Sequence, residues 1–164
     1  MSQKRKGGIV PAAEREQRTR SWSFEHPLGT NSEVHGQMLS DACGMERIGV
    51  HLMRIPPGKE NFVFHAHNVE EEFYFIVSGR GVAEIGDEEH EIGPGDFLGF
   101  GTPSVGHQLK NPFDEDLVYL VGGERQGVEV AEFPKLKKRI IRVGREAQVV
   151  DDSQLLPFWK GEEE

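Results

Sequence analysis

Residues 64–79 read FHAHNVEEEFYFIVSG and carry more information on fold and chemistry than any other part of the chain. His65 and His67 are separated by one residue, so their side chains lie on the same face of a β-strand. Glu72 begins a run of mostly apolar residues that also reads as a strand. Imidazole and carboxylate groups together form the ligand set that proteins use for divalent transition metals. The stretch therefore predicts neighbouring strands that bring metal ligands together.

A third histidine, His107, lies in a later segment that also reads as a strand. The candidate ligands thus come from three strands, and only a folded barrel brings such residues together. Three imidazole nitrogens and one carboxylate can enclose a metal ion and leave coordination positions open for water or substrate. We therefore predict a metal site inside a β-barrel, with the ligands His65, His67, Glu72 and His107. The pattern does not identify the reaction.

Short strand patterns alternate with turn residues at intervals of about 8 to 12 residues, which is typical of a β-sandwich or barrel. The expected strands cover residues 22–24, 46–55, 62–67, 72–78, 82–85, 90–92, 97–100, 107–110 and 117–121. Turns such as Pro56-Pro57-Gly58 separate them. Since no long stretch shows helical periodicity, we expect an all-β fold.

Composition limits the class of protein. The 164 residues suffice for one domain with a hydrophobic core, and the 36% hydrophobic and 29% charged residues indicate a globular chain. The formal net charge of -9 disfavours a nucleic-acid partner. No apolar run reaches the roughly 18 residues of a membrane span, and the basic N-terminus lacks the hydrophobic stretch of a secretory signal. Because Cys43 is the only cysteine, no internal disulfide can form, and we expect a cytoplasmic protein without a membrane partner.

The chain divides into three expected parts. Residues 1–20 are polar and form an N-terminal arm with one helical turn, residues 21–134 form the barrel, and residues 135–164 form a C-terminal extension that packs on the barrel. Within the extension, we expect the apolar residues 155–159 to dock on the barrel as a clip, ahead of an acidic end at 161–164. The basic residues of 135–145 are interpreted as a solvated strand face rather than an anion-docking patch.

The strand expected at 72–78 has two different faces. Glu72, Tyr74 and Ile76 share the face that we assign to the barrel interior. The opposite face consists of Phe73, Phe75 and Val77. Because this apolar face needs cover, and because exposed sheet edges are commonly paired between subunits, we expect a homodimer.

At these residues the chain resembles the cupin superfamily, and in particular its small single-domain members of the conserved-barrel type. The first cupin motif is matched by Gly58-(six)-His65-x-His67-(four)-Glu72-(six)-Gly79. The first spacer is one residue longer than the usual five. The six residues that precede Gly79 select Glu72 over Glu70 and Glu71, which we expect in a solvated turn.

The second cupin motif is matched less closely. Gly95, Asp96, His107 and Asn111 occur in the expected order, and three residues separate His107 from Asn111 as in the motif. Pro103 lies only four residues before His107, and the span from Gly95 to His107 is about one residue longer than usual. We attribute the difference to a bulge or longer loop at residues 99–103. The resemblance covers residues 46–123.

The resemblance implies a double-stranded β-helix, or jelly-roll barrel, that holds one divalent transition metal at His65, His67, Glu72 and His107. Zinc, iron, manganese, nickel and cobalt all suit these ligands. The resemblance further implies a small-molecule metalloenzyme, with a dioxygenase, a sugar isomerase or epimerase, and a lyase as the possible types. We expect any acid or base to come from cavity residues such as Tyr74 or His51.

Other interpretations stay open. A non-catalytic cupin that binds or senses a small ligand fits the same residues, and so does a metal-free barrel whose polar side chains bond to one another or to water. A transcription regulator would need a helix-turn-helix domain, for which we expect the arm and the extension to be too short. His26, His35 and His90 lack partners at ligand spacing.

Overall fold

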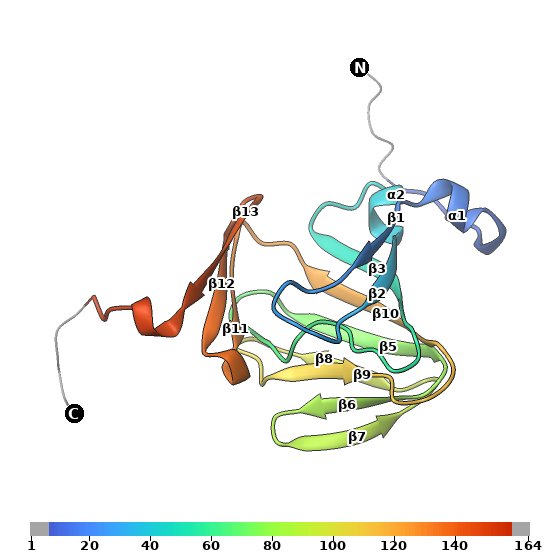
Figure 1. Ribbon diagram of the computed structural model, residues 1–164. Helices are drawn as coiled ribbons and strands as arrows, with labels where there is room; N and C mark the ends of the chain where they lie inside the picture. Colours follow the sequence, from blue (N-terminus) through green and yellow to red (C-terminus); the bar gives the residue numbers. More distant parts are fainter. Residues whose placement is uncertain (1–6, 159–164) are drawn as a thin grey trace.

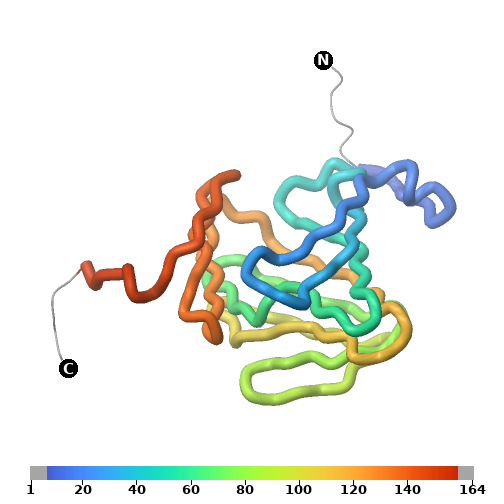
Figure 2. Tube along the Cα trace, in the orientation of Figure 1, coloured from blue at the N-terminus to red at the C-terminus, as the bar shows by residue number. Residues whose placement is uncertain are grey.

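The computed structural model describes residues 7–158, and most of their regular structure is β-strand (Figure 1 and Figure 2). The helices are short, namely η1 (Ala12–Glu14), α1 (Arg15–Arg18), α2 (Leu39–Ala42), η2 (Pro134–Leu136) and η3 (Asp152–Gln154). The first two agree with the helical turn expected in the N-terminal arm, of which residues 1–6 lie outside the described part. Within residues 7–158, no helix combines the length and the apolar character needed to cross a membrane. The predicted all-β fold is confirmed.

One wall of the barrel is a six-stranded antiparallel sheet. Its strands lie in the order β1 (Ser21–Phe24), β2 (Val34–Met38), β3 (Ile48–Ile55), β10 (Leu117–Glu124), β5 (Glu72–Ser78) and β8 (Phe97–Phe100). The central strands are rich in β-branched and aromatic residues, which fit a pleated and largely buried surface. This sheet carries Glu72 on one of its middle strands.

Two smaller sheets complete the barrel. One has the order β7 (Glu88–Ile92), β6 (Gly81–Ile85) and β9 (His107–Lys110). The other has the order β13 (Glu146–Asp151), β12 (Lys138–Val143), β11 (Val128–Phe133) and β4 (Ala66–His67). Figure 1 shows β6 and β7 beneath β5 and β8, with β11, β12 and β13 standing at the left side of the barrel.

The hydrophobic core lies between the sheets. On β5, Tyr74 and Ile76 are fully buried, whereas Phe75 and Val77 are 40% and 44% exposed. The alternation that the sequence predicts for this strand is therefore confirmed. Their partners in the core include Met53, Ile55, Ala83, Leu109, Leu117 and Tyr119. Burial of one large apolar side chain contributes about 1.5–3 kcal/mol relative to exposure, so this cluster stabilises the barrel.

Several strands differ from the expectation. The strands at 72–78, 97–100 and 107–110 have the expected bounds. The strand expected at 62–67 is reduced to β4, because only Ala66 and His67 pair with β11. The hairpin of β12 and β13 was not expected, since β13 reads EAQVVD and gains its strand conformation by pairing with β12 rather than by an apolar run.

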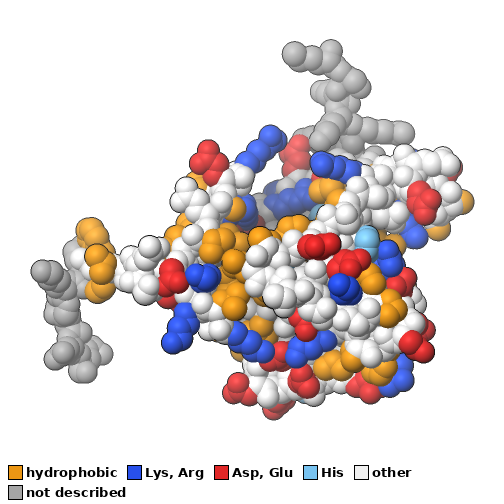
Figure 3. All heavy atoms as spheres, in the orientation of Figure 1, with side chains coloured by type: hydrophobic (Ala, Val, Ile, Leu, Met, Phe, Trp, Pro, Cys, Tyr) orange, Lys and Arg blue, Asp and Glu red, His pale blue; other side chains and the backbone are white. Residues whose placement is uncertain are grey.

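The expected apolar clip does not dock on the barrel. After η3, residues 155–158 lead away from the body (Figure 2), and apolar side chains lie on this projection (Figure 3). Leu156 is 86% exposed, which excludes tight packing against the barrel. The extension is instead attached through the β11–β12 ladder and through ion pairs such as Arg142 with Glu70. Trp159 and the acidic end at 161–164 lie outside the described residues.

The outer face of the six-stranded sheet is apolar over four neighbouring strands. We call outer face the set Ile48, Val50, Leu52, Phe73, Phe75, Val77, Phe97, Val118 and Leu120. One row crosses the sheet from strand to strand and consists of Leu52, Leu120, Phe75 and Phe97. Phe97 is 66% exposed. A contiguous apolar surface of this kind is typical of a protein interface.

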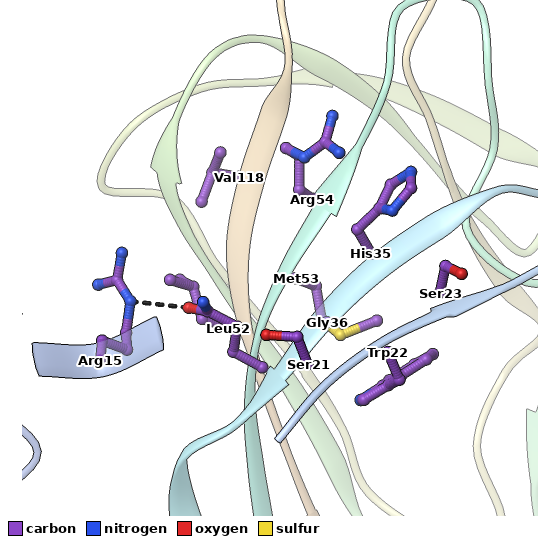
Figure 4. A pocket seen from close by; sticks show the side chains of 11 residues that line it. Arg15, Ser21, Trp22, Ser23, His35, Gly36, Leu52, Met53, Arg54 and Val118 are labelled. Carbon is purple, nitrogen blue, oxygen red and sulfur yellow. Dashed lines mark hydrogen bonds between the residues drawn. The ribbon is translucent and has the colours of Figure 1, made fainter. Parts of the chain in front are cut away.

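The two ends of the outer face carry opposite charges. Glu71 and Glu124 lie at one end, beside Ile48. Arg15 and Arg54 lie at the other end, where they line a hollow of about 530 Å³ (Figure 4). Arg54 is paired with Asp116 at 3.2 Å, so the net positive charge of this end comes from Arg15. A second copy could face this sheet, related by a half-turn about an axis that lies in the sheet plane and runs across the strands. Each acidic end would then lie against a basic end. We therefore propose that a second copy of this chain covers the outer face.

This arrangement predicts a homodimer at micromolar concentration, which size exclusion with light scattering measures. Combining Phe75→Glu with Phe97→Glu should give monomers, because the new carboxylates would be buried in the interface without partners. Val143→Glu, on the β12–β13 hairpin and 60% exposed in the wild type, is the matched control and should leave the dimer intact. A monomeric wild type, or a dimeric double variant, would contradict this interface.

Candidate metal centre

Three chain segments position the side chains that the sequence predicts as ligands. His65 and His67 flank Ala66 at β4, Glu72 is the first residue of β5, and His107 is the first residue of β9. The backbone N–H of His65 donates to the carbonyl of His107 over 3.1 Å, and the N–H of His107 donates back over 2.8 Å. Backbone pairing therefore fixes two of the imidazoles relative to each other.

The four side chains meet at one point. One nitrogen or oxygen atom of each residue lies within 4.8 Å of the corresponding atoms of the other three. Measured from Oε2 of Glu72, the Nε2 atoms of His107, His67 and His65 lie at 3.2, 3.6 and 3.9 Å. The structure thus brings together all four residues that the sequence predicts, and they come from separate strands as expected.

Backbone carbonyls set the tautomer of two imidazoles. Nδ1 of His65 lies 2.7 Å from the carbonyl of Val63, and Nδ1 of His107 lies 3.0 Å from the carbonyl of Val105. A carbonyl oxygen can only accept a hydrogen bond, so each Nδ1 carries the proton. In the neutral rings, the lone pair of Nε2 then points toward Glu72. This is the arrangement in which an outer partner orients a metal-ligating histidine.

The third imidazole has no hydrogen bond within the described part of the chain. Both ring nitrogens of His67 are buried and without such a partner. A buried imidazole without a partner is costly, and a metal at the centre of the cluster would satisfy Nε2. Together with the lone pairs of His65 and His107, the cluster then presents only acceptors, namely three imidazole nitrogens and one carboxylate. A divalent cation fits such a donor set, so the cluster can bind a metal.

The electrostatics favour an ionised carboxylate beside a neutral His65. Burial by itself would raise the pKa of Glu72, but the three neighbouring imidazoles outweigh it and hold the pKa well below its usual value. Burial would lower the pKa of His67, but Glu72, Glu129 and Glu70 outweigh it and raise that pKa. Burial lowers the pKa of His65, with the neighbouring His107 and His67 adding to the effect against the attraction of Glu72. Metal coordination requires an ionised Glu72 and neutral imidazoles, so a bound cation would displace any proton that His67 carries on its ligating nitrogen.

Tyr74 is hydrogen-bonded to the carboxylate of Glu72 without being one of the four predicted ligands. Its hydroxyl donates a hydrogen bond of 2.7 Å to Oε2 of Glu72, and burial together with the charge of Glu72 raises the pKa of Tyr74 well above its usual value. A phenol held in this way stays protonated. Tyr74 is therefore a positioning residue, and the expectation that it serves as an acid or base is not supported.

No sequence pattern indicates a role for Glu129, which lies on β11 and is only 4% exposed. Its carboxylate accepts hydrogen bonds from the backbone N–H groups of Asn68, Val69 and Glu70, and so holds the loop between β4 and β5. Its Oε1 atom also lies 3.9 Å from Nδ1 of His67. Glu129 can thus orient the imidazole that has no other partner. Only the pairing of β11 with β4 reveals this role.

The remaining histidines lie apart from the cluster. His35 pairs with Glu33, His90 pairs with Glu88, and Nδ1 of His26 accepts a hydrogen bond from the N–H of Leu28. His51 is different, because it lines a cavity of about 220 Å³ together with Glu72. The expectation that His51 lines the cavity is confirmed.

Comparison with known proteins identifies the relatives of this chain. The model of the cupin domain family matches residues 51–123. An uncharacterized protein of Methanocaldococcus jannaschii is 32% identical over 57 residues, which are 35% of this chain and 44% of that protein. The chain therefore matches less than half the length of this curated relative.

Two solved structures are similar over a larger part of the chain. A protein of Acidithiobacillus ferrooxidans, provisionally named a sugar phosphate isomerase, is 32% identical with a TM-score of 0.86, and the match covers 93% of this chain and 97% of that one. A sugar phosphate isomerase from a cupin superfamily of Silicibacter pomeroyi is 27% identical with a TM-score of 0.71, covering 74% of this chain and 78% of that one.

The cluster predicts about one divalent transition metal per chain, measured by elemental analysis of the purified protein. The double variant His65→Ala with His67→Ala removes two of the four predicted ligands and should lower the metal content by roughly tenfold or more. His90→Ala, which removes an exposed histidine outside the cluster, is the control and should keep the wild-type content. Equal metal content in the wild type and the double variant would count against the site.

Replacing Glu129→Gln should weaken both the loop and the metal site. An amide cannot accept at both ends, so a backbone N–H loses its partner, and the free energy of unfolding should fall by about 1–3 kcal/mol. Loss of the charge near His67 should lower the metal affinity by about 10- to 100-fold. Thermal unfolding and metal titration measure the two effects. Glu146→Gln, at an exposed position on β13, should change neither much.

Proposed function

The chain belongs to the cupin superfamily, and on this premise we propose that it is a metal-dependent isomerase of a small phosphorylated sugar. The observation that carries the proposal is the meeting of three imidazoles and one carboxylate beside a cavity. The choice of reaction class is supported by the two solved relatives that bear the name sugar phosphate isomerase, one of which aligns over nearly its whole length.

Interconversion of an aldose and a ketose moves hydrogen between two adjacent carbons and between their oxygens, without net oxidation. Negative charge develops on these oxygens, and catalysis depends on stabilising that charge. When bound, a divalent metal would supply this stabilisation as a Lewis acid. His65, His67, Glu72 and His107 would hold the metal, while Tyr74 and Glu129 keep the ligands in position.

The cavity suits a small ligand. It has a volume of about 220 Å³ and is walled in part by Trp22, Phe62 and Val121. Apolar walls displace water from a bound ligand and strengthen the electrostatic interactions around it. Glu72 is the cluster residue that lines this cavity, and through it a bound ligand would adjoin the cluster.

The proposal is tested with protein loaded in turn with zinc, iron(II), manganese(II), cobalt(II) and nickel(II). Each form is incubated with a panel of aldose phosphates, and nuclear magnetic resonance follows ketose formation. We expect turnover with at least one metal and its loss on chelation. Glu72→Gln should lower kcat/KM by about 100-fold or more, because it weakens the ligand set.

Glu71→Gln is the matched control, since it removes a neighbouring carboxyl that lies outside the cluster, and it should retain wild-type activity. Oxygen consumption, or release of carbon dioxide from another substrate, would replace the proposal by a dioxygenase or a lyase. Tight binding of a small molecule without turnover by any metal form would instead identify a ligand-binding or sensor protein.

A further inference from the structure

The cavity beside the metal cluster has a second polar region, at the junction of β3 and the end of β10. Arg125 follows β10 directly, and His51 lies on the inward face of β3, paired with Val121. Both side chains line the cavity that also contains Glu72. One small ligand can therefore touch Glu72 and this region at the same time.

Arg125 is held rigidly and keeps a donor free. Its Nη2 atom donates to Oδ1 of Asp41 over 2.5 Å, and its Nη1 atom donates to the carbonyl of Met45 over 3.4 Å. Its Nε–H makes no hydrogen bond to any residue in the described range 7–158. A guanidinium anchored at one edge with a free N–H at another is suited to bind an oxygen acceptor.

The carboxylates that face this region are already engaged. Asp41 accepts from Arg125, and Glu124 accepts from the backbone N–H of Glu71 and from the side-chain amide of Gln126. Neither occupies the free Nε–H of Arg125. The acceptor for that donor therefore has to come from a ligand or from water.

His51 is a second donor beside Arg125. Its Nδ1 atom is buried and has no hydrogen-bond partner among the described residues, whereas Nε2 lies on the side of Arg125. Burial and the charge of Arg125 lower the pKa of His51 against the pull of Asp41, so the ring is neutral. Because Nδ1 has no partner among the described residues, a ligand acceptor at Nε2 would select the tautomer that carries the proton there.

Gly49 leaves space for both donors, because it has no side chain. A Cβ atom built on Gly49 would lie 3.0 Å from Nε of Arg125 and 3.3 Å from Nε2 of His51. Gly49 does not have a positive φ, so the backbone alone does not demand glycine. The two donors converge over this position because no side chain stands there.

We infer that Arg125 and His51 form the second half of the binding site. As a donor pair they would hold an anionic oxygen group of the ligand, while the other end of the ligand meets Glu72 and the cluster to which it belongs. Carboxylate and phosphate share this chemistry, and the choice of phosphate rests on the proposed function. Arg125 and His51 would then select ligands that carry an anionic group, and Gly49 would keep the place open.

Calorimetric titration of metal-free protein with inorganic phosphate, and separately with acetate, tests the pair without any catalysed reaction. We expect phosphate to bind, and Arg125→Gln and Gly49→Ala each to weaken binding by about tenfold or more through loss of a charge-assisted hydrogen bond or of space. Arg54→Gln is the control and should bind like the wild type. It removes an arginine from the outward side of β3, the strand that carries His51 and Gly49. Acetate binding at least as tight as phosphate would identify a carboxylate ligand.

Metal content near the wild-type value, measured on the same variants, shows that each of them still folds. Equal phosphate binding by wild type, Arg125→Gln and Gly49→Ala, or no binding of either anion to the wild type, would overturn the inference. Absence of isomerase turnover would contradict the proposed function but would leave this inference standing. Where turnover exists, Arg125→Gln should raise KM for the phosphorylated sugar about tenfold or more and leave KM for the unphosphorylated sugar nearly unchanged.

Discussion

Four hydrogen-bond acceptors share one largely buried space, and much of the surrounding structure serves to keep them there. The Nε2 atoms of three imidazoles surround an ionised carboxylate, at 3.2 to 3.9 Å from its Oε2 atom. Burying such a group without compensation is unfavourable. The carbonyls of Val63 and Val105 nevertheless direct two rings into it, and the Tyr74 hydroxyl steadies the carboxylate. A bound cation would make this otherwise unfavourable arrangement of four side chains favourable.

Strand β5 shows how one segment serves two purposes. Its inward residues carry Glu72 and Tyr74 into the metal cluster, and Ile76 continues into the core. Its outward residues belong to the apolar outer face, where Phe73 stacks on Phe97 with ring centroids 5.7 Å apart. Because side chains alternate along a strand, a slip of one residue would expose Glu72 and bury the residues of the outer face. Register on this strand is therefore constrained from both faces.

The sequence predicted the fold class and the members of the cluster, because period-two spacing and the His-x-His and Glu pattern are local features. It could not predict the residues that act through long-range pairing. Glu129 becomes relevant only when β11 lies beside β4, and Arg125 only when the end of β10 meets α2, which carries Asp41. The clip predicted at 155–159 shows the opposite error. Its apolar character suggested that it docks on the barrel, but Leu156 is exposed. Local patterns specify strands and faces, whereas contacts between distant strands follow from topology.

The cavity has two chemically opposite ends. At one end, the cluster around Glu72 presents only acceptors and calls for a cation. At the other, Arg125 is a donor only, His51 can donate from Nε2, and the indole N–H of Trp22 is buried without a partner among the described residues. A ligand that fits both ends needs oxygens that reach a metal and a separate acceptor group that meets the donors. A phosphorylated hydroxycarbonyl compound has both, whereas a plain catechol or thiol lacks the second. This polarity is a physical reason to favour an isomerase among the reactions that the same metal ligands would allow.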